Sequence, residues 1–367
     1  MDACHVRVTL SLARVAVIIV GLSSHSLDYS LCLVSFCQDL LKNEYDEAKL
    51  KHFFTTELLC INTISSDVQL VKQSTGGCLL QSLQSSPCGR FLLAQLTTQF
   101  SYSVPMKRFG KDVQVWDLES KDDSGGVIDV VSLPVDDEIP LNYDACSRHP
   151  RSFHFHPCFD HTIIFSKATD GGISLSEQFD GGGDDNNERD ALYCQAINET
   201  SLTLERPVKL VSLQWRYADI DFCESGLGVV EEFRWNDRME RKWILEVSGN
   251  KRLLWERSWE DRYTAPGEPL TRRSGVGGYS YIVQPTPTSI YLKGAGASPL
   301  GDRPFLDLLD FSEDEVNPTR LWRCAAPLEG ELDASKEVNG VVPAERKDVF
   351  ESLVLLFDDN DTVLISR

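Results

Sequence analysis

The sequence predicts an all-β fold, a β-propeller of about five recognisable blades that is incomplete or open. A tight-turn signal followed by a short apolar, β-favouring run recurs along the chain. The spacing of these units is roughly even, although it exceeds the ~40–45 residues of the best-known blade repeat. Residues 266–304 are rich in Pro and Gly and show nothing of a helix-covered parallel sheet. The repeating units are residues 86–117, 153–165, 213–230, 278–292 and 353–365.

The N-terminal segment is harder to interpret. Residues 8–22 form an apolar run interrupted by Arg14, too short and too charged for a transmembrane helix of ~20 apolar residues. Three interpretations stay open: a targeting segment with Arg7 as its basic flank, an inner propeller strand, or a segment unrelated to the rest. Further on, residues 39–51 carry enough Glu, Lys and Leu for a short helix, and residues 53–64 predict a strand.

The most informative stretch is residues 86–117. Residues 87–89, Pro-Cys-Gly, make a tight-turn signal, and the apolar run 91–96 after it suits a buried strand. Residues 113–118 predict a second strand with Val113 and Val115 on one face. Together the two runs predict two inner strands of a small antiparallel sheet.

Two acidic segments are expected to be loops. Residues 180–190 (DGGGDDNNERD) are of low complexity and predict a mobile, exposed insertion. Clustered carboxylates can bind calcium, but EF-hand spacing fails here, so a solvated loop is the preferred interpretation. Residues 358–361 (DDND) predict a hairpin turn, because Val363 stands where an EF-hand loop needs glycine.

Composition excludes several classes of partner. The 367 residues are 42% hydrophobic and 25% charged, which is ordinary for a globular protein. The 36 basic and 56 acidic side chains give a net charge of −20, which repels phosphate backbones and anionic membrane surfaces. Residues 216–257 interleave Trp and Arg in a way that can stack on single-stranded bases, but glutamates nearly cancel the charge. We therefore expect no nucleic-acid and no membrane partner.

The eleven cysteines show no CxxC pair and no even framework. Such scattered residues fit free thiols in a reducing compartment better than a disulfide scaffold.

Five segments carry a resemblance to a known family: residues 37–47, 90–117, 133–141, 267–282 and 291–311. In collinear order they resemble the propeller region of the plant-type glutamyl endopeptidases, a branch of the prolyl oligopeptidase-like serine peptidases. The resemblance runs from about residue 36 to the C-terminus. It therefore divides the chain into an unassigned segment, residues 1–35, and a β-propeller region, residues 36–367.

This resemblance carries further expectations. It implies that residues 39–51 are a charged connection between blades, and that roughly two N-terminal blades of the family's propeller are replaced or missing. It implies a plastid location, with a cytoplasmic one as the alternative, because residues 1–20 are not Ser-rich and make a poor transit peptide. The implied partners are peptide substrates and an α/β-hydrolase domain in cis.

No catalytic residue is predicted in this chain. The family's peptidases place their nucleophile in a G-x-S-x-G elbow between strand and helix, in the hydrolase domain. Two serines come near the motif, but Ser280 is followed two residues later by Ile282, and Ser298 by Leu300. The chain also ends at Arg367, directly after an apolar strand, so we expect it to be inactive alone.

No metal or cofactor is predicted either. One cluster has metal-ligand residue types, and His154 and His156 would share a strand face, a spacing that zinc and copper sites use. Phe153 and Phe155 on the opposite face explain the alternation as an ordinary strand, and Gly294 and Gly296 lack the third glycine of a dinucleotide loop. The cluster comprises His149, His154, His156, Cys158 and His161.

The function expected from sequence is therefore the non-catalytic propeller portion of a glutamyl-endopeptidase-like serine peptidase. In that family the propeller admits flexible peptides to the hydrolase domain and keeps folded proteins away. The alternative is a stand-alone propeller that serves as a protein-interaction scaffold.

Overall fold

The computed structural model describes most of the chain, in two compact units. The first unit takes the described residues within 1–217 and 274–279, and the second takes those within 218–273 and 280–367. The described residues are 10–12, 15–21, 40–62, 65–72, 78–120, 126–139, 144–173, 188–273, 278–299, 301–313, 316, 318–324, 352–356 and 363–366.

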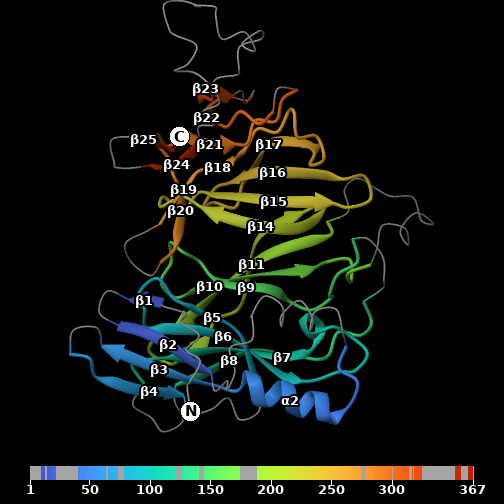
Figure 1. The fold of residues 1–367 in the computed structure, drawn as a ribbon, viewed down its shortest axis with the longest axis vertical. Coiled ribbons are helices and arrows are strands. Elements are labelled where there is room, and N and C mark those ends of the chain that lie inside the picture. Colours follow the sequence, from blue (N-terminus) through green and yellow to red (C-terminus); the bar gives the residue numbers. More distant parts are fainter. Residues whose placement is uncertain are drawn as a thin grey trace, which may run out of the picture. The chain divides into compact units, whose positions relative to one another are not determined.

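The first sheet has four antiparallel strands in the order β1-β2-β3-β4 (Figure 1). β2 pairs with β3 along its whole length, from Val15 opposite Asn62 to Gly21 opposite Thr56. Residues 10–12 and 15–21, part of the segment with three interpretations, thus have strand backbone; the boundary after residue 35 stays a prediction. The strands are β1 (Leu10–Leu12), β2 (Val15–Gly21), β3 (Thr56–Asn62) and β4 (Val68–Lys72).

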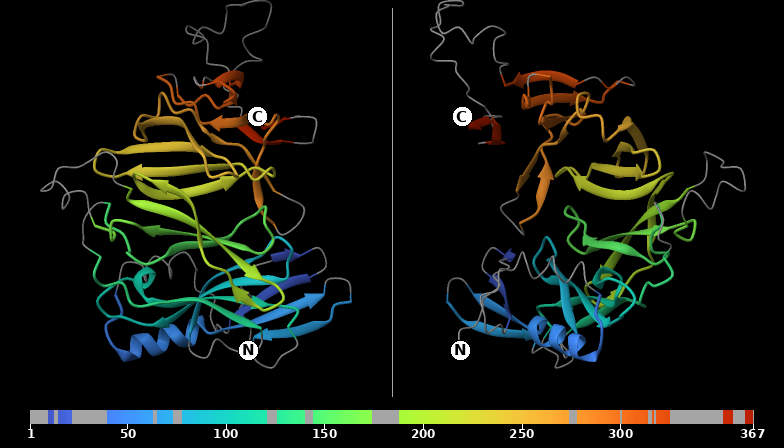
Figure 2. Two further views of the ribbon diagram at one scale, coloured as in Figure 1. Left: turned by 180° about the vertical axis from the view of Figure 1, so that it is seen from behind. Right: turned by 45° about the vertical axis from the view of Figure 1, so that its right-hand side comes forward.

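A helix, α2 (Glu44–Phe54), precedes β3. The charged connection expected from the resemblance for residues 39–51 is therefore wrong, and the short helix suggested by composition is present. The Asn43 side chain accepts a hydrogen bond from the Asp46 N–H at 3.0 Å, which caps the first turn. Acidic residues in the first turn and Lys51 in the last complement the helix dipole. Leu50 belongs to one buried cluster with Leu79 of β5, and the helix lies beside the sheet that contains β5 (Figure 2).

The second sheet contains the two strands predicted from residues 86–117. β6 and β7 are its inner, antiparallel pair, with Phe91 opposite Asp117. Val113 and Val115 are buried on one face, and Trp116 is buried on the other, so both faces of β7 are covered. The strands are β5 (Leu79–Ser85), β6 (Phe91–Gln99), β7 (Gly110–Asp117) and β8 (Val127–Leu133), with a 3₁₀ turn, η1 (Met106–Arg108), before β7.

The third sheet completes the first unit. The repeating unit 153–165 corresponds to β9 and β10, which pair with each other, and β11 pairs with β10, β12 and β13. Arg189 and Asp190 are buried, so the exposed insertion predicted for residues 180–190 is wrong for these two; residues 180–187 lie outside the described residues. The strands are β9 (Arg151–Phe155), β10 (Thr162–Ala168), β11 (Asp190–Asn198), β12 (Thr203–Leu204) and β13 (Val208–Leu213).

The second unit opens with the four-stranded meander β14-β15-β16-β17, drawn in yellow in Figure 1. Acidic side chains pair with its cations, as in Lys242 with Glu231 at 3.0 Å and Arg241 with Glu256 at 2.7 Å. In the segment 216–257, where Trp and Arg are interleaved along the sequence, basic side chains thus form ion pairs with glutamates of neighbouring strands. The strands are β14 (Arg216–Phe222), which crosses the unit boundary, β15 (Gly228–Arg234), β16 (Met239–Leu245) and β17 (Lys251–Ser258).

The remaining strands form another four-stranded sheet and two hairpins. The predicted unit 278–292 is divided, because β20 pairs with β19 whereas β21 pairs with β18 and β22. β24 pairs with β25, as expected for residues 353–365, while residues 358–361 lie outside the described residues. The strands are β18 (Glu268–Pro269), β19 (Thr271–Arg273), β20 (Ser280–Ile282), β21 (Ser289–Gly294), β22 (Phe305–Asp310), β23 (Pro318–Arg323), β24 (Ser352–Leu356) and β25 (Val363–Ser366).

Within each unit, neighbouring sheets share an apolar core. In the first unit, Phe91 and Val115 of the second sheet pack with Phe155 and Ile163 of the third. In the second unit, Ile244 of the β14–β17 sheet belongs to one buried cluster with residues of β21 and β22. Successive antiparallel sheets of four or five strands that bury a common core confirm the predicted fold class, an all-β protein built from β-propeller blades.

Candidate functional site: a cationic pocket in the first unit

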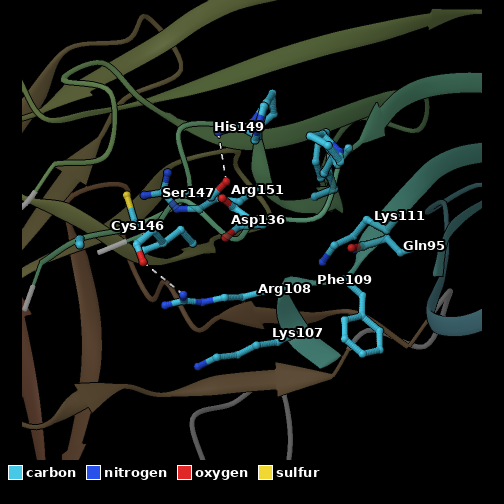
Figure 3. Close-up of a pocket in the computed structure, with 17 residues that line it drawn as sticks. Gln95, Lys107, Arg108, Phe109, Lys111, Asp136, Cys146, Ser147, His149 and Arg151 are labelled. Atoms are coloured by element: carbon cyan, nitrogen blue, oxygen red, sulfur yellow. Dashed lines mark hydrogen bonds between the residues drawn. The ribbon is translucent and has the colours of Figure 1, made fainter. Parts of the chain in front are cut away.

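A pocket of about 380 Å³ lies where the second and third sheets of the first unit meet. Its walls come from η1 and the start of β7, from the end of β8, and from residues 145–153, which lead into β9 (Figure 3). This volume is in the range of small-ligand sites, which are typically ~300–1,000 Å³.

The pocket is basic although the protein is acidic. Lys107, Arg108, Lys111 and Arg151 line it, and Asp136 is the one carboxylate in the lining. The chain as a whole carries a net charge of −20. Cations gathered in a concave site against the overall charge favour an anionic ligand, such as a carboxylate.

Two cations of the pocket are positioned by the turn η1. The Arg108 N–H donates to the Pro105 carbonyl at 2.8 Å, which closes the turn, and the Arg108 carbonyl accepts from the Asp136 N–H at 2.9 Å. The Arg108 guanidinium also donates to the Ile139 carbonyl at 3.3 Å. Figure 3 shows Lys107 and Arg108 extending from this turn on the same side. The turn therefore holds both side chains at one wall.

Lys111 occupies a central strand, where β7 pairs it with Thr97 of β6 and Leu133 of β8. Burial lowers the pKa of Lys111, and the charge of Asp136 opposes this effect only in part. A bound carboxylate would stabilise the ammonium form and so gain binding energy from Lys111.

Arg151 is the fourth cation of the pocket. Its Nη2 donates to Asp190, while Nη1 is buried with no hydrogen-bond partner among the described residues. Ser152 beside it has a φ of 57°, and the β9–β10 register shifts at this point. Such bulges change the direction of side chains next to binding sites.

A buried network of ion pairs lies at the third sheet and is centred on Arg216. Arg216 donates to both carboxylate oxygens of Asp170, at 2.9 and 2.8 Å, and to Asp190 at 3.1 Å. It also donates to the Asp144 carbonyl at 2.7 Å, just before the segment that lines the pocket. Arg216 therefore links the pocket wall to the sheet.

Gly172 holds the same segment from the other side. Its carbonyl accepts from the Cys146 N–H at 3.0 Å. Its φ is +80°, and a Cβ added there would lie 2.2 Å from the Cys146 carbonyl oxygen. Only glycine fits this position without moving the pocket wall.

The histidine cluster considered in the sequence does not converge on one point. His149 lines the pocket, whereas the His154 ring contacts the Ser152 carbonyl at 2.9 Å. His156 is buried, and its Nδ1 accepts from the Cys158 N–H at 3.1 Å. His161 instead contacts Glu199, with 2.6 Å between its Nδ1 and a carboxylate oxygen. In the described parts of the chain, no three His, Cys, Asp or Glu side chains are placed to hold one metal ion.

The two serines considered as nucleophiles lie in the second unit. Ser280 begins the short strand β20, and the Ser298 hydroxyl donates to the Gly301 carbonyl at 2.6 Å. Neither stands at a turn from a strand to a helix. The assignment of no catalytic residue to this chain stays a prediction.

Sequence reasoning missed the pocket and a second polar cluster. The closely spaced cations Lys107, Arg108 and Lys111 are a local sequence signal for a basic site. Arg151 and Asp136 lie beside them only because the strands pair. Cys88, His161 and Glu199 are likewise far apart in the sequence and meet in the fold. Among the described residues, no helix has the length and apolar character needed to cross a membrane.

Comparison with known proteins supports the resemblance noted in the sequence. Two curated proteins, each named probable glutamyl endopeptidase, chloroplastic, match over 295 residues. The protein from Oryza sativa subsp. japonica is 29% identical and that from Arabidopsis thaliana is 30% identical. The matches cover 78% of this chain but only 29% and 28% of the relatives, so the chain spans less than a third of their length. No protein-family model matches the chain.

Solved structures show more distant similarity. The β-propeller domain of the Trilobed protease from Pyrococcus furiosus has a TM-score of 0.40 and 10% identity, covering 86% of this chain and 70% of that one. The acylaminoacyl peptidase of Pyrococcus horikoshii has a TM-score of 0.39 and 9% identity, covering 86% and 39%. At this distance neither similarity carries a functional argument. The two sequence relatives confirm the predicted resemblance to plant glutamyl endopeptidases over 78% of this chain.

Proposed function

We propose that this chain is the β-propeller portion of a serine peptidase related to the plant glutamyl endopeptidases, and that it controls which peptides reach a hydrolase domain. The observation that carries the proposal is the 29–30% identity to two such proteins over 295 residues. A propeller acts here by size exclusion and positioning rather than by proton transfer. The partner is an α/β-hydrolase domain in cis, and the location is the plastid named for both relatives.

The cationic pocket supplies a way to select peptides. Lys107, Arg108 and Lys111 present positive charge in a concave site. The relatives are named for glutamyl specificity, and a glutamate side chain carries the carboxylate that this pocket favours. The pocket therefore binds acidic side chains of peptides on their way to the hydrolase domain.

A binding measurement tests this role. A fluorescent peptide rich in glutamate should bind the full chain more tightly than the matched glutamine peptide, and added salt should weaken the difference. The double variant Arg108→Gln, Lys111→Gln should bind the glutamate peptide at least about tenfold more weakly. Lys209→Gln is the matched control, because Lys209 is exposed, lies outside the pocket and pairs with Glu188 at 3.6 Å.

Equal affinity for the two peptides, or an unchanged affinity of the double variant, would show that the pocket does not select acidic peptides. If acidic peptides bind but the chain has no effect on cleavage when joined to a hydrolase domain, the interaction-scaffold alternative is the better account.

A further inference from the structure

Three polar side chains from three different hairpin turns of the first unit meet at its surface. Cys88 lies in the turn between β5 and β6, His161 in the turn between β9 and β10, and Glu199 in the turn after β11. The Cys88 Sγ lies 3.4 Å from Nε2 of His161. On the other side of the imidazole ring, Nδ1 lies 2.6 Å from a carboxylate oxygen of Glu199. Cys88, His161 and Glu199 thus have the arrangement of a nucleophile, a base and a group that orients the base.

Local structure explains why the thiol is presented outward. The Gly89 N–H donates to the Ser86 carbonyl at 3.0 Å, and Gly89 has a φ of 79°, so the chain turns sharply at Cys88. The Phe91 N–H donates to the Ser86 hydroxyl at 3.0 Å, which ties the turn to β6. The Phe91 ring also meets the His161 ring edge-on, with 5.4 Å between centroids. The turn and the imidazole are therefore held against the same buried residue.

Cys88 differs from the other cysteines whose side chains are described. It is exposed, whereas the other six are intermediate or buried. Burial raises the pKa of Cys194 to about 11 and also raises the pKa of Cys146, so these two thiols stay protonated near neutral pH. Among these cysteines, accessibility and a neighbouring imidazole oriented by a carboxylate coincide at Cys88.

We propose that Cys88 is a reactive thiol that His161 activates as a general base, and that it forms mixed disulfides with small disulfides. His161 takes the thiol proton as the Cys88 sulfur attacks one sulfur of the disulfide. The disulfide bond breaks, and the departing sulfur takes the proton back from His161. The products are a mixed disulfide on Cys88 and one free thiol, so Cys88 is oxidised and the small disulfide is reduced. Glu199 is a positioning residue, because it acts through His161.

The charges around the thiol determine which disulfides react best. Arg90 is the cation there, and it pairs with Asp117 at 2.9 Å, with Glu199 at 3.5 Å and with Glu119 at 3.6 Å. One guanidinium and three carboxylates make the charge around the thiol negative. The net charge of the chain, −20, has the same sign. The site therefore favours a cationic disulfide such as cystamine over a dianionic aromatic disulfide.

The test measures the rate at which Cys88 reacts in the full chain at pH 7. Mass spectrometry of the peptide that contains Cys88 follows its mixed disulfide, which separates it from all other cysteines. At this pH only a few per cent of ordinary cysteine thiols are ionised, so an assisting base can accelerate the reaction by roughly tenfold or more. His161→Gln should lower the cystamine rate by about tenfold, and cystamine should react faster than the dianionic disulfide at low salt.

Further variants distinguish activation of the Cys88 thiol by His161 from a general effect of the substitutions on folding. Cys88→Ser should abolish the modified peptide, and His52→Gln, which changes an exposed histidine of α2 outside both this cluster and the pocket, should leave the rate unchanged. Glu199→Gln should lower the rate and change its dependence on pH between about 5 and 9, since the imidazole loses its charged partner. Circular dichroism and thermal melting confirm that each variant is folded. An unchanged rate in folded His161→Gln would overturn the proposal, as would equal rates for the cationic and anionic disulfides.

Discussion

One buried histidine makes the stability of the first unit depend on pH. Burial lowers the pKa of His156 from 6.5 to about 4, with a smaller contribution from the charge of His154. Between these two values the unfolded chain binds a proton that the folded chain does not. Stability that is present above pH 6.5 is therefore lost as pH falls towards 4, by at most about 3 kcal/mol.

Urea unfolding at pH 7.5 and pH 5 checks this prediction. His156→Asn can still accept the hydrogen bond from the Cys158 N–H but does not titrate, so the variant should lose less stability between the two pH values than the natural chain. Identical losses in the two proteins would show that His156 is not responsible.

Arg216 is the residue on which the buried ion pairs of the first unit depend. Both Arg216 and Asp190 are almost fully buried, with 3% and 0% of their side chains exposed. Arg216→Met leaves buried carboxylates without their main partner, and we expect a loss of about 3–5 kcal/mol in the free energy of unfolding. Lys209→Met, which removes an exposed pair with Glu188, should cost below about 1 kcal/mol. Chemical denaturation compares them, and similar losses would contradict this account.

At the scale of one element, the loop after β10 determines the shape of the pocket wall. Gly172→Ala would push a Cβ to 2.2 Å from the Cys146 carbonyl oxygen, whereas Gly171→Ala meets nothing within 4 Å. Both positions have positive φ, so both substitutions carry about 1–2 kcal/mol of backbone strain. Gly172→Ala should lose roughly 3 kcal/mol or more, because it adds the clash.

The same pair of variants should differ in ligand binding. Gly172→Ala should weaken binding of the glutamate-rich peptide, while Gly171→Ala should leave it unchanged, because only the first displaces residues that line the pocket. Fluorescence anisotropy measures both. Equal binding by the two variants would mean that the loop does not shape the site.

At the scale of the whole molecule, we expect no peptidase activity from residues 1–367 alone. Amide hydrolysis requires an activated nucleophile, a base and an oxyanion hole acting together. The purified chain should neither cleave glutamate-containing peptides nor react with a serine-directed fluorophosphonate, and joining it to a matching hydrolase domain should restore both. Labelling of the isolated chain that Ser280→Ala or Ser298→Ala abolishes would show that the chain carries its own nucleophile.

The sequence by itself determined the fold class and the family resemblance. A short apolar run after a turn signal, as in Phe91–Gln99, predicts a buried strand, and the alternation of Val113 and Val115 in Gly110–Asp117 predicts a second strand. Both signals are local, because successive side chains of a strand point to opposite faces. The collinear segments shared with glutamyl endopeptidases are also readable without coordinates. The helix Glu44–Phe54 shows the limit of resemblance, since its Asn43 cap and charged turns are local signals that the family expectation overruled.

Only the tertiary structure decided which distant residues meet. Lys111 and Arg151 line one pocket because β7 and β9 belong to sheets that share a core, and Cys88, His161 and Glu199 meet because three hairpin turns end side by side. Arg189 and Asp190 looked like part of a solvated acidic loop, yet they are buried because Arg216 and Asp170 neutralise their charges. Such pairings depend on the packing of whole sheets, which no local pattern in the sequence specifies.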